Sequence, residues 1–138
     1  MRIGFVGAGN MAEAMMKGII TGGVAKTEDL IASEIVPERR DYITNTLGVQ
    51  TVSDNIEVVR SSDVVVLAVK PHHVGPVLDE LKPYLSGNHL LISIAAGIDS
   101  AFIEAGLGEG VRVVRVMPNM PALIGEGAAA LASGSATT

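Results

Sequence analysis

The stretch MRIGFVGAGNMA, residues 1–12, decides the fold of this chain. The apolar run Arg2–Val6 predicts a short buried strand, and Gly7–Gly9 predicts a tight turn directly after it. Apolar side chains then recur at helical spacing over Met11–Ile20, which predicts a helix beginning at the turn. The turn and the start of the helix match the pattern G-x-G-x-x-A, and they lie between a strand and a helix, as dinucleotide binding requires.

Each small residue of this pattern has its own physical role. Gly7 permits the tight turn, Gly9 lets the backbone approach a pyrophosphate, and Ala12 allows close contact between helix and strand. The unpaired N–H groups and the positive end of the helix would then meet the phosphate charge. The alternative is a glycine turn that serves packing alone, and the flanking strand and helix favour dinucleotide binding over it.

Strand and helix signals alternate along the rest of the chain. The run Asp63–Val69 is apolar on both faces, which is typical of a central parallel strand. Short connections between alternating elements predict an α/β fold, a doubly wound and mostly parallel sheet of the Rossmann type, formed as a single domain by residues 1–138. The other expected strands cover residues 30–32, 49–52, 90–94, 111–117 and 128–132, and the expected later helices are Pro37–Leu47, a short one capped by Asp54, His72–Leu81 and Phe102–Ala105.

Composition excludes several classes of function. The net charge is −5, no basic run occurs and aromatic residues make up only 3%, which argues against a nucleic-acid partner. The absence of cysteine excludes disulfides, Cys-ligated zinc and thiolate catalysis, and no metal site is expected. The sequence begins without the apolar region of a signal peptide and has no apolar stretch of about 18–20 residues, so we expect a soluble, cytoplasmic protein without a membrane partner.

The end of the second expected strand bears on the choice of cofactor. An acid at this position would hold the adenosine ribose hydroxyls of NADH, and Ser33 and Glu34 occupy it. Glu34 would repel the 2′-phosphate of NADPH, whereas Ser33 with Arg39 or Arg40 could accept that phosphate. The alternative reading makes these charges ordinary solvated surface. The choice between NADH and NADPH therefore stays open, with Glu34 favouring NADH slightly.

The other strand ends supply further candidates, because nucleotides bind outside the carboxyl ends of parallel strands. Lys70 and Asn119 are polar groups that could orient a cofactor there, although each could also be an ordinary surface or turn residue. His72 and His73 follow at a helix start, and neighbours on a helix point in different directions, so we expect them to be structural or solvated.

Several stretches together resemble pyrroline-5-carboxylate reductase, the last enzyme of proline synthesis. The stretch Ile3–Ala12 is shared by many dehydrogenases, whereas the motifs AVKP, S-x-A-A-G and R-V-M-P-N-x-P are more particular to this family. The resemblance covers nearly the whole chain. The matching stretches are Ile3–Ala12, Ser62–Pro71, Ile92–Gly97 and Arg115–Pro121.

The resemblance implies hydride transfer from NADPH or NADH to the C=N carbon of an imino acid, 1-pyrroline-5-carboxylate, which gives L-proline. It implies that Lys70 and Asn119 help to position the reacting groups. It also implies three groups of cofactor-binding residues: Gly7, Ala8, Gly9, Asn10 and Met11 at the pyrophosphate; Ser33, Glu34 and Asn55 around the adenosine; and Ala68, Val69, Lys70, Pro71, Ala95, Ala96 and Asn119 along the inner half.

Members of this family carry a second, helical domain that forms the dimer and supplies the substrate-binding loop. We expect that domain to lie outside residues 1–138, and therefore expect dinucleotide binding with little turnover by these residues alone, and a homo-oligomer for the full-length protein. Two rivals remain. One is the cofactor domain of another dehydrogenase, of the β-hydroxyacid or F420-dependent NADP reductase type, and the other is a non-enzymatic nucleotide sensor.

Overall fold

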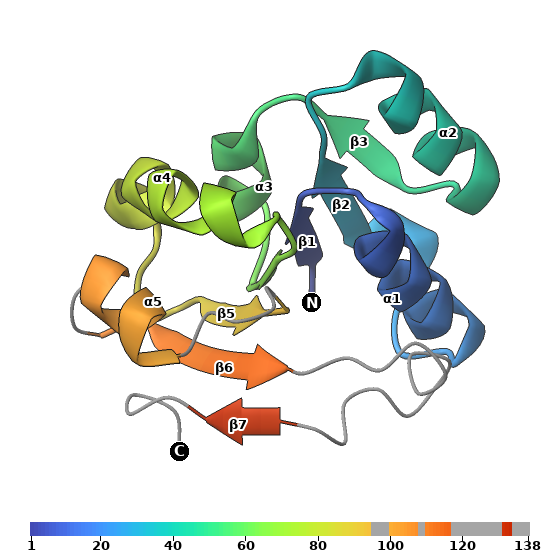
Figure 1. Ribbon diagram of the computed structural model, residues 1–138. Coiled ribbons are helices and arrows are strands. Elements are labelled where there is room, and N and C mark those ends of the chain that lie inside the picture. Colours follow the sequence, from blue (N-terminus) through green and yellow to red (C-terminus); the bar gives the residue numbers. More distant parts are fainter. Residues whose placement is uncertain (95–99, 108–109, 117–130, 134–138) are drawn as a thin grey trace.

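The computed structural model describes residues 1–94, 100–107, 110–116 and 131–133, which build one sheet with helices around it (Figure 1). The strand order is β3-β2-β1-β4-β5-β6-β7. Strands β1 to β6 are parallel, and β7 pairs antiparallel with β6. The predicted doubly wound, mostly parallel sheet is therefore confirmed. The strands are β1 Ile3–Val6, β2 Leu30–Ser33, β3 Gln50–Val52, β4 Val64–Leu67, β5 Leu90–Ser93, β6 Arg112–Val116 and β7 Leu131–Ser133.

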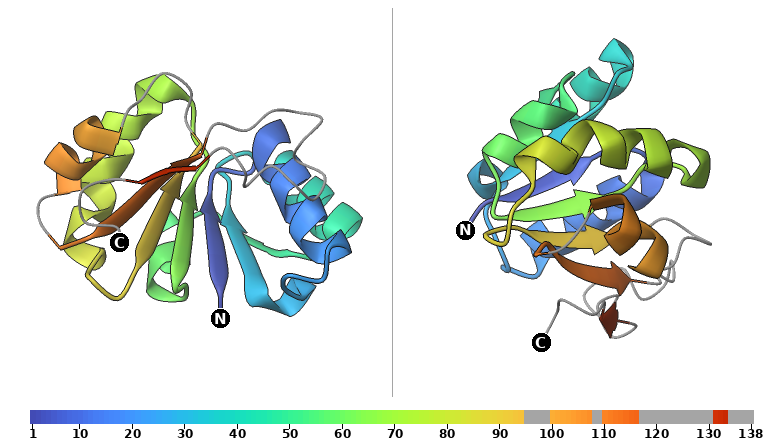
Figure 2. Two further views of the ribbon diagram at one scale, coloured as in Figure 1. Left: turned by 90° about the horizontal axis from the view of Figure 1, so that it is seen from below. Right: turned by 90° about the vertical axis from the view of Figure 1, so that its left-hand side faces the viewer.

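Helices cover both faces of the sheet (Figure 2). On one face, Met16 of α1 (Asn10–Thr21) and Ile43 of α2 (Pro37–Leu47) are buried with Phe5 of β1. On the other face, a second core unites side chains of α3 (Asn55–Arg60), α4 (Pro71–Leu81) and α5 (Ser100–Leu107) with β4 and β5. Short 3₁₀ turns form at Thr27–Asp29 and Lys82–Tyr84. None of the helices in these ranges has both the length and the apolar character needed to cross a membrane.

Local signals in the sequence set most element boundaries. Asp54 caps α3, because its side chain accepts a hydrogen bond from the backbone N of Ile56 at 3.0 Å. Pro37 is the first residue of α2, and Gly48 ends that helix in the left-handed conformation with φ 75°. The predicted cap at Asp54 and the predicted helix Pro37–Leu47 are therefore confirmed. The central strand β4 is shorter than expected, and for the last strand the expected start at residue 128 lies outside the described residues.

The order of the strands reverses between β1 and β4, because the chain runs from β1 outward to β3 and then returns to the middle of the sheet. In open α/β sheets, ligands bind outside the carboxyl ends of the strands at this kind of switch point. Here that place is the end of β1, which is also where the glycine turn leads into α1.

Candidate functional site

The turn between β1 and α1 has the backbone that its glycines predict. Gly7 has φ 100°, and a Cβ there would come within 2.9 Å of the carbonyl oxygen of Ala68. Gly9 is the N-cap of α1 and is extended, and a Cβ added to it would meet no atom within 4 Å. The space beside Gly9 is therefore open, and the first-turn N–H groups of α1 have no capping side chain at this residue.

A cavity of about 460 Å³ lies at this turn. Its walls come from the turn itself and from the carboxyl ends of β2 and β4, so it occupies the switch point of the sheet. The structure brings together nine of the residues that the sequence proposed for the cofactor. They are Gly7, Ala8, Gly9, Ser33, Glu34, Asn55, Ala68, Val69 and Lys70.

Other proposed residues are placed differently. Asn10 and Met11 are the first two residues of α1, and Pro71 is the first of α4, but none of the three lines this cavity. Their predicted contacts with a cofactor stay predictions, since the start of a helix binds a phosphate through its backbone N–H groups. Ala95, Ala96 and Asn119 lie outside the described residues.

A chain of hydrogen bonds supports the floor of the cavity. The Ser33 hydroxyl is buried, accepts a long contact of 3.4 Å from the backbone N of Gly7 and donates to Oδ1 of Asn55 at 2.6 Å. The Asn55 amide in turn donates to the Glu80 carboxylate on α4 at 2.9 Å. Ser33 and Asn55 therefore tie β2 and α3 to the glycine turn, a positioning role that the sequence did not predict.

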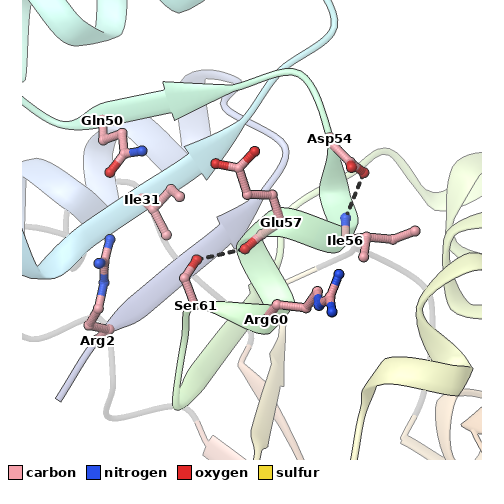
Figure 3. Close-up of a pocket in the computed structure, with 8 residues that line it drawn as sticks. All are labelled: Arg2, Ile31, Gln50, Asp54, Ile56, Glu57, Arg60 and Ser61. Atoms are coloured by element: carbon pink, nitrogen blue, oxygen red, sulfur yellow. Dashed lines mark hydrogen bonds between the residues drawn. The ribbon is translucent and has the colours of Figure 1, made fainter.

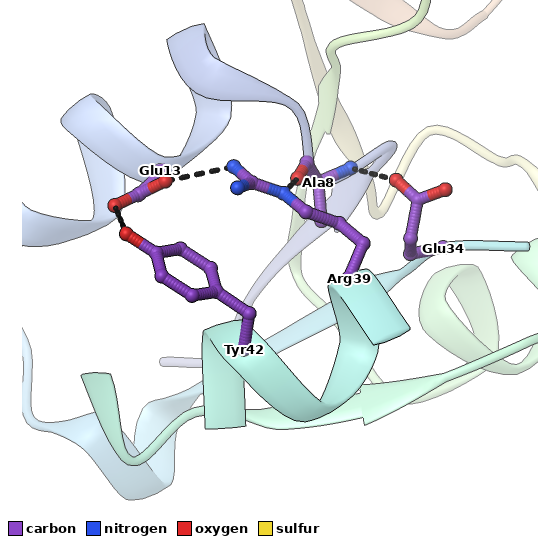
Figure 4. A network of polar contacts seen from close by, with 5 residues as sticks. All are labelled: Ala8, Glu13, Glu34, Arg39 and Tyr42. Carbon is purple, nitrogen blue, oxygen red and sulfur yellow. Dashed lines mark hydrogen bonds and ion pairs between the residues drawn. The ribbon is translucent and has the colours of Figure 1, made fainter. Parts of the chain in front are cut away.

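Glu34 presents its carboxylate beside the glycine turn (Figure 4). One oxygen accepts from the backbone N of Ala8 at 3.4 Å, and the other accepts from the backbone N of Val36 at 3.2 Å. Arg39 and Arg40 do not line the cavity; each donates to a backbone carbonyl at 2.7 Å, Arg39 to Ala8 and Arg40 to Glu34. The end of the cavity beside β2 is therefore acidic.

Sequence reasoning missed four residues of the cavity wall, namely Ile35, His72, His73 and Val77. Ile35 is 79% exposed, which is unusual for a large apolar side chain. Its position directly after Glu34, at the end of the second expected strand, is the signal by which the sequence could have identified it. Both histidines are exposed, as expected for solvated side chains, and they also line the cavity. Their ring centroids lie 4.1 Å apart at the start of α4, so the two rings contact each other instead of pointing apart.

Within the described ranges, no group of three His, Cys, Asp or Glu side chains is arranged to hold a metal ion. A second cavity of about 370 Å³ lies between α3 and the strands β2 and β3 (Figure 3). Arg2, Glu57 and Arg60 give it mixed charge, and the buried Nε of Arg2 finds no hydrogen-bond partner in the described part of the chain. It shares no residue with the cavity at the glycine turn.

Comparison with known proteins shows the family of this chain. The family model described as "NADP oxidoreductase coenzyme F420-dependent" matches residues 2–97. Pyrroline-5-carboxylate reductase of Methanosarcina acetivorans is 42% identical over 137 residues, which cover 99% of this chain and 51% of the relative. The reductase of Pisum sativum is 40% identical over 136 residues, or 99% of this chain and 49% of the relative. The chain thus spans about half the length of these curated relatives.

Solved structures agree with the sequence comparisons. A pyrroline-5-carboxylate reductase from Coxiella burnetii superposes with a TM-score of 0.86 at 33% identity and covers 99% of this chain and 51% of its own. The Plasmodium falciparum pyrroline carboxylate reductase with NADP bound gives 0.83 at 30% identity, over 100% of this chain and 50% of its own. The resemblance predicted from the motifs is confirmed, and the chain belongs to the family of NADP oxidoreductases described as coenzyme F420-dependent.

Proposed function

We propose that this chain is the cofactor-binding half of a pyrroline-5-carboxylate reductase and that the full-length protein reduces 1-pyrroline-5-carboxylate to L-proline. The observation that carries the proposal is the cavity at the switch point, which is lined by nine residues that the sequence assigns to a dinucleotide. Its open space beside Gly9 fits a ligand that approaches the backbone closely. The named reductases that match nearly the whole chain supply the reaction.

Each part of the cofactor would contact a different group of cavity residues. The turn Gly7–Gly9 and the start of α1 would bind the pyrophosphate, while Glu34 would accept hydrogen bonds from the adenosine ribose and Ile35 would pack against the adenine. Ala68–Lys70 at the end of β4 would hold the inner half, together with Ala95, Ala96 and Asn119 as the sequence proposes. When bound, the nicotinamide supplies the hydride, and these residues supply position and electrostatics.

The domain arrangement, location and assembly are part of the same proposal. Residues 1–138 would form one dinucleotide-binding domain, and a helical domain of the full-length protein would complete the imino-acid site and the homo-oligomer. We place the protein in the cytoplasm, in keeping with its lack of cysteine, and expect no nucleic-acid partner at a net charge of −5.

The first test is calorimetry of the 138-residue chain with NADH and with NADPH. We expect saturable binding of at least one cofactor at micromolar to millimolar concentration, with little formation of proline from the imino acid. Absence of heat with both cofactors at millimolar concentration would remove the proposed function. Robust turnover by this chain would instead contradict the assignment of the substrate site to another domain.

A second candidate is another dehydrogenase of this family, because the matching family model carries the name of F420-dependent NADP oxidoreductases. Such an enzyme would share the cavity at the glycine turn and differ in its second substrate. A panel of imino acids, β-hydroxyacids and reduced F420, tested with the full-length protein, separates the two candidates. Reduction of the imino acid alone supports the first, and hydride transfer between F420 and NADP supports the second.

Replacing Glu34 with alanine should change the preference between cofactors. The variant loses the acceptor for the ribose hydroxyls, so we expect NADH to bind about tenfold more weakly, the cost of one charge-assisted hydrogen bond. NADPH should bind equally well or more tightly, because the carboxylate no longer repels the 2′-phosphate. Titration calorimetry with both cofactors measures the ratio. Glu38→Ala, which removes an acid from the first turn of α2 outside the cavity, is the control, and an equal change for both cofactors would show that Glu34 does not read the ribose.

A further inference from the structure

Ala8 lies in the middle of the turn that the proposed function assigns to the pyrophosphate. Its N–H faces the Glu34 carboxylate, and its carbonyl oxygen accepts a hydrogen bond from Nε of Arg39 at 2.7 Å. Ala8 is buried, and its carbonyl lies outside the helical ladder, whose first bond runs from the N of Glu13 to the oxygen of Gly9. The peptide group between Ala8 and Gly9 is therefore held from outside the turn by the short bond from Arg39 of α2, whereas the contact of 3.4 Å to Glu34, which follows β2, is long.

We propose that Arg39 is a positioning residue that holds the glycine turn in the conformation that binds the pyrophosphate. This inference rests on the proposed function. A bond from a guanidinium to a carbonyl is charge-assisted and stronger than a neutral one, and 2.7 Å is short for N–H···O. By keeping the Ala8 carbonyl on the side of α2, Arg39 leaves the ligand side of the turn to backbone N–H groups.

The guanidinium of Arg39 is itself fixed by two neighbours (Figure 4). Its Nη2 forms an ion pair with Oε1 of Glu13 at 2.7 Å, and the hydroxyl of Tyr42 donates to the other oxygen of Glu13 at 3.0 Å. The Tyr42 ring also lies 4.9 Å from the guanidinium carbon. The side chains of Arg39 and Glu13 are only 24% and 22% exposed, so the pair is less screened than a surface salt bridge.

Arg39 also has an electrostatic effect on the same end of α1. Glu13 lies in the first turn of that helix, where a negative charge is favourable for the helix but opposes a bound phosphate. The ion pair with Arg39 neutralises this charge. Loss of Arg39 would therefore loosen the turn and leave an unpaired acid near the phosphate.

The sequence left open that Arg39 binds the 2′-phosphate of NADPH. A positioning role predicts a different result from that one. The pyrophosphate is common to NADH and NADPH, so a residue that positions the turn must affect both cofactors equally. A residue that contacts the 2′-phosphate must affect NADPH alone. Glu34, which reads the ribose in the proposed function, should shift the ratio of the two affinities, and Arg39 should not.

The test is the dissociation constant of both cofactors for Arg39→Met, with thermal unfolding recorded for every variant. We expect both constants to rise about tenfold and by equal factors. The matched control is Arg60→Met, which also removes an arginine packed on a tyrosine, with its guanidinium carbon 5.9 Å from the ring of Tyr84, but lies on α3 away from the turn. It should leave both constants within about twofold of the wild type.

A double variant separates positioning from the effect of the unpaired charge. In Arg39→Met/Glu13→Gln the unpaired charge is gone but the bond to Ala8 is still missing, so both constants should stay about threefold above the wild type. Full recovery to the wild-type constants would assign the loss to the charge of Glu13 and overturn the positioning role. If Arg39→Met does not fold, Arg39→Lys replaces it. Lysine lacks the planar fork whose Nε and Nη2 bind Ala8 and Glu13 together, so this variant should weaken the binding of both cofactors by about threefold. Unchanged constants in Arg39→Met, or weakening of NADPH alone, would overturn the inference while leaving the proposed function in place. A wild type that binds neither cofactor would overturn both.

Discussion

Replacing Gly9 with alanine is expected to weaken the binding of NADH and NADPH about 100-fold and to leave the fold intact. The backbone of Gly9, with φ −79° and ψ −168°, is one that alanine adopts readily, and the added Cβ meets no protein atom within 4 Å. That empty space is where the proposed pyrophosphate must approach the turn. A methyl group there would cost about two charge-assisted hydrogen bonds, or about 3 kcal/mol, which corresponds to about 100-fold in affinity.

Calorimetry and thermal unfolding of the same Gly9→Ala sample check this prediction. The unfolding temperature should fall by only a few degrees, because glycine and alanine differ by about 1 kcal/mol or less as N-caps in this setting. Retained affinity for both cofactors would show that no ligand comes close to Gly9, and the pyrophosphate would have to lie elsewhere. A large loss of stability would show instead that the site beside Gly9 is occupied by protein.

Replacing Gly4 with alanine is expected to lower the free energy of unfolding by about 3 kcal/mol, the upper part of the range for overpacked cores. Gly4 lies in the middle of β1, where α3 packs closely on the sheet. An added Cβ would lie 2.3 Å from the hydroxyl oxygen of Ser62 and 2.5 Å from Cγ1 of Val58. Both neighbours are buried, and the Ser62 hydroxyl is held by a bond of 2.6 Å to the carbonyl of Val58, so neither can move away cheaply.

Urea unfolding of the two glycine variants measures this difference, with Gly9→Ala as the control for the same chemical change. The double variant Gly4→Ala/Ser62→Ala should be less destabilised than the sum of the two single changes, because removal of the hydroxyl relieves the closest contact. Additive losses would show that Ser62 is not the source of the strain. A Gly4→Ala protein as stable as the wild type would contradict the close packing of α3 on β1.

The residues of the first turn show why so much of the fold was predictable. Gly7, Gly9 and Ala12 act through backbone conformation and through contacts within a few residues, so their spacing predicts a strand, a turn and a helix without knowledge of the rest. The run of valines in β4 is apolar on both faces and predicts a central position in a parallel sheet. Asp54, Pro37 and Gly48 set helix ends by equally local means.

The residues of the candidate site were likewise predictable only in part. Residues at strand ends, such as Glu34 and Lys70, could be chosen from the sequence because parallel strands bring their carboxyl ends to one edge of the sheet. His72 and His73 are exposed as expected, but the contact between their rings at 4.1 Å could not be predicted, because side-chain rotation at an exposed helix start is not set by helical spacing. Ile35 was missed because an apolar residue after a strand carries no chemistry until a cavity is seen beside it.

The sequence by itself determined the alternation of strands and helices, the glycine turn and the acid at the end of β2. Only the tertiary structure decided that Arg39 turns away from the cavity to bind Ala8 and Glu13. Those partners lie 31 and 26 residues earlier in the chain and become neighbours through the parallel pairing of β1 with β2. Local periodicity reports which face of an element is buried, whereas the partner of a long charged side chain depends on which other element the packing brings within reach.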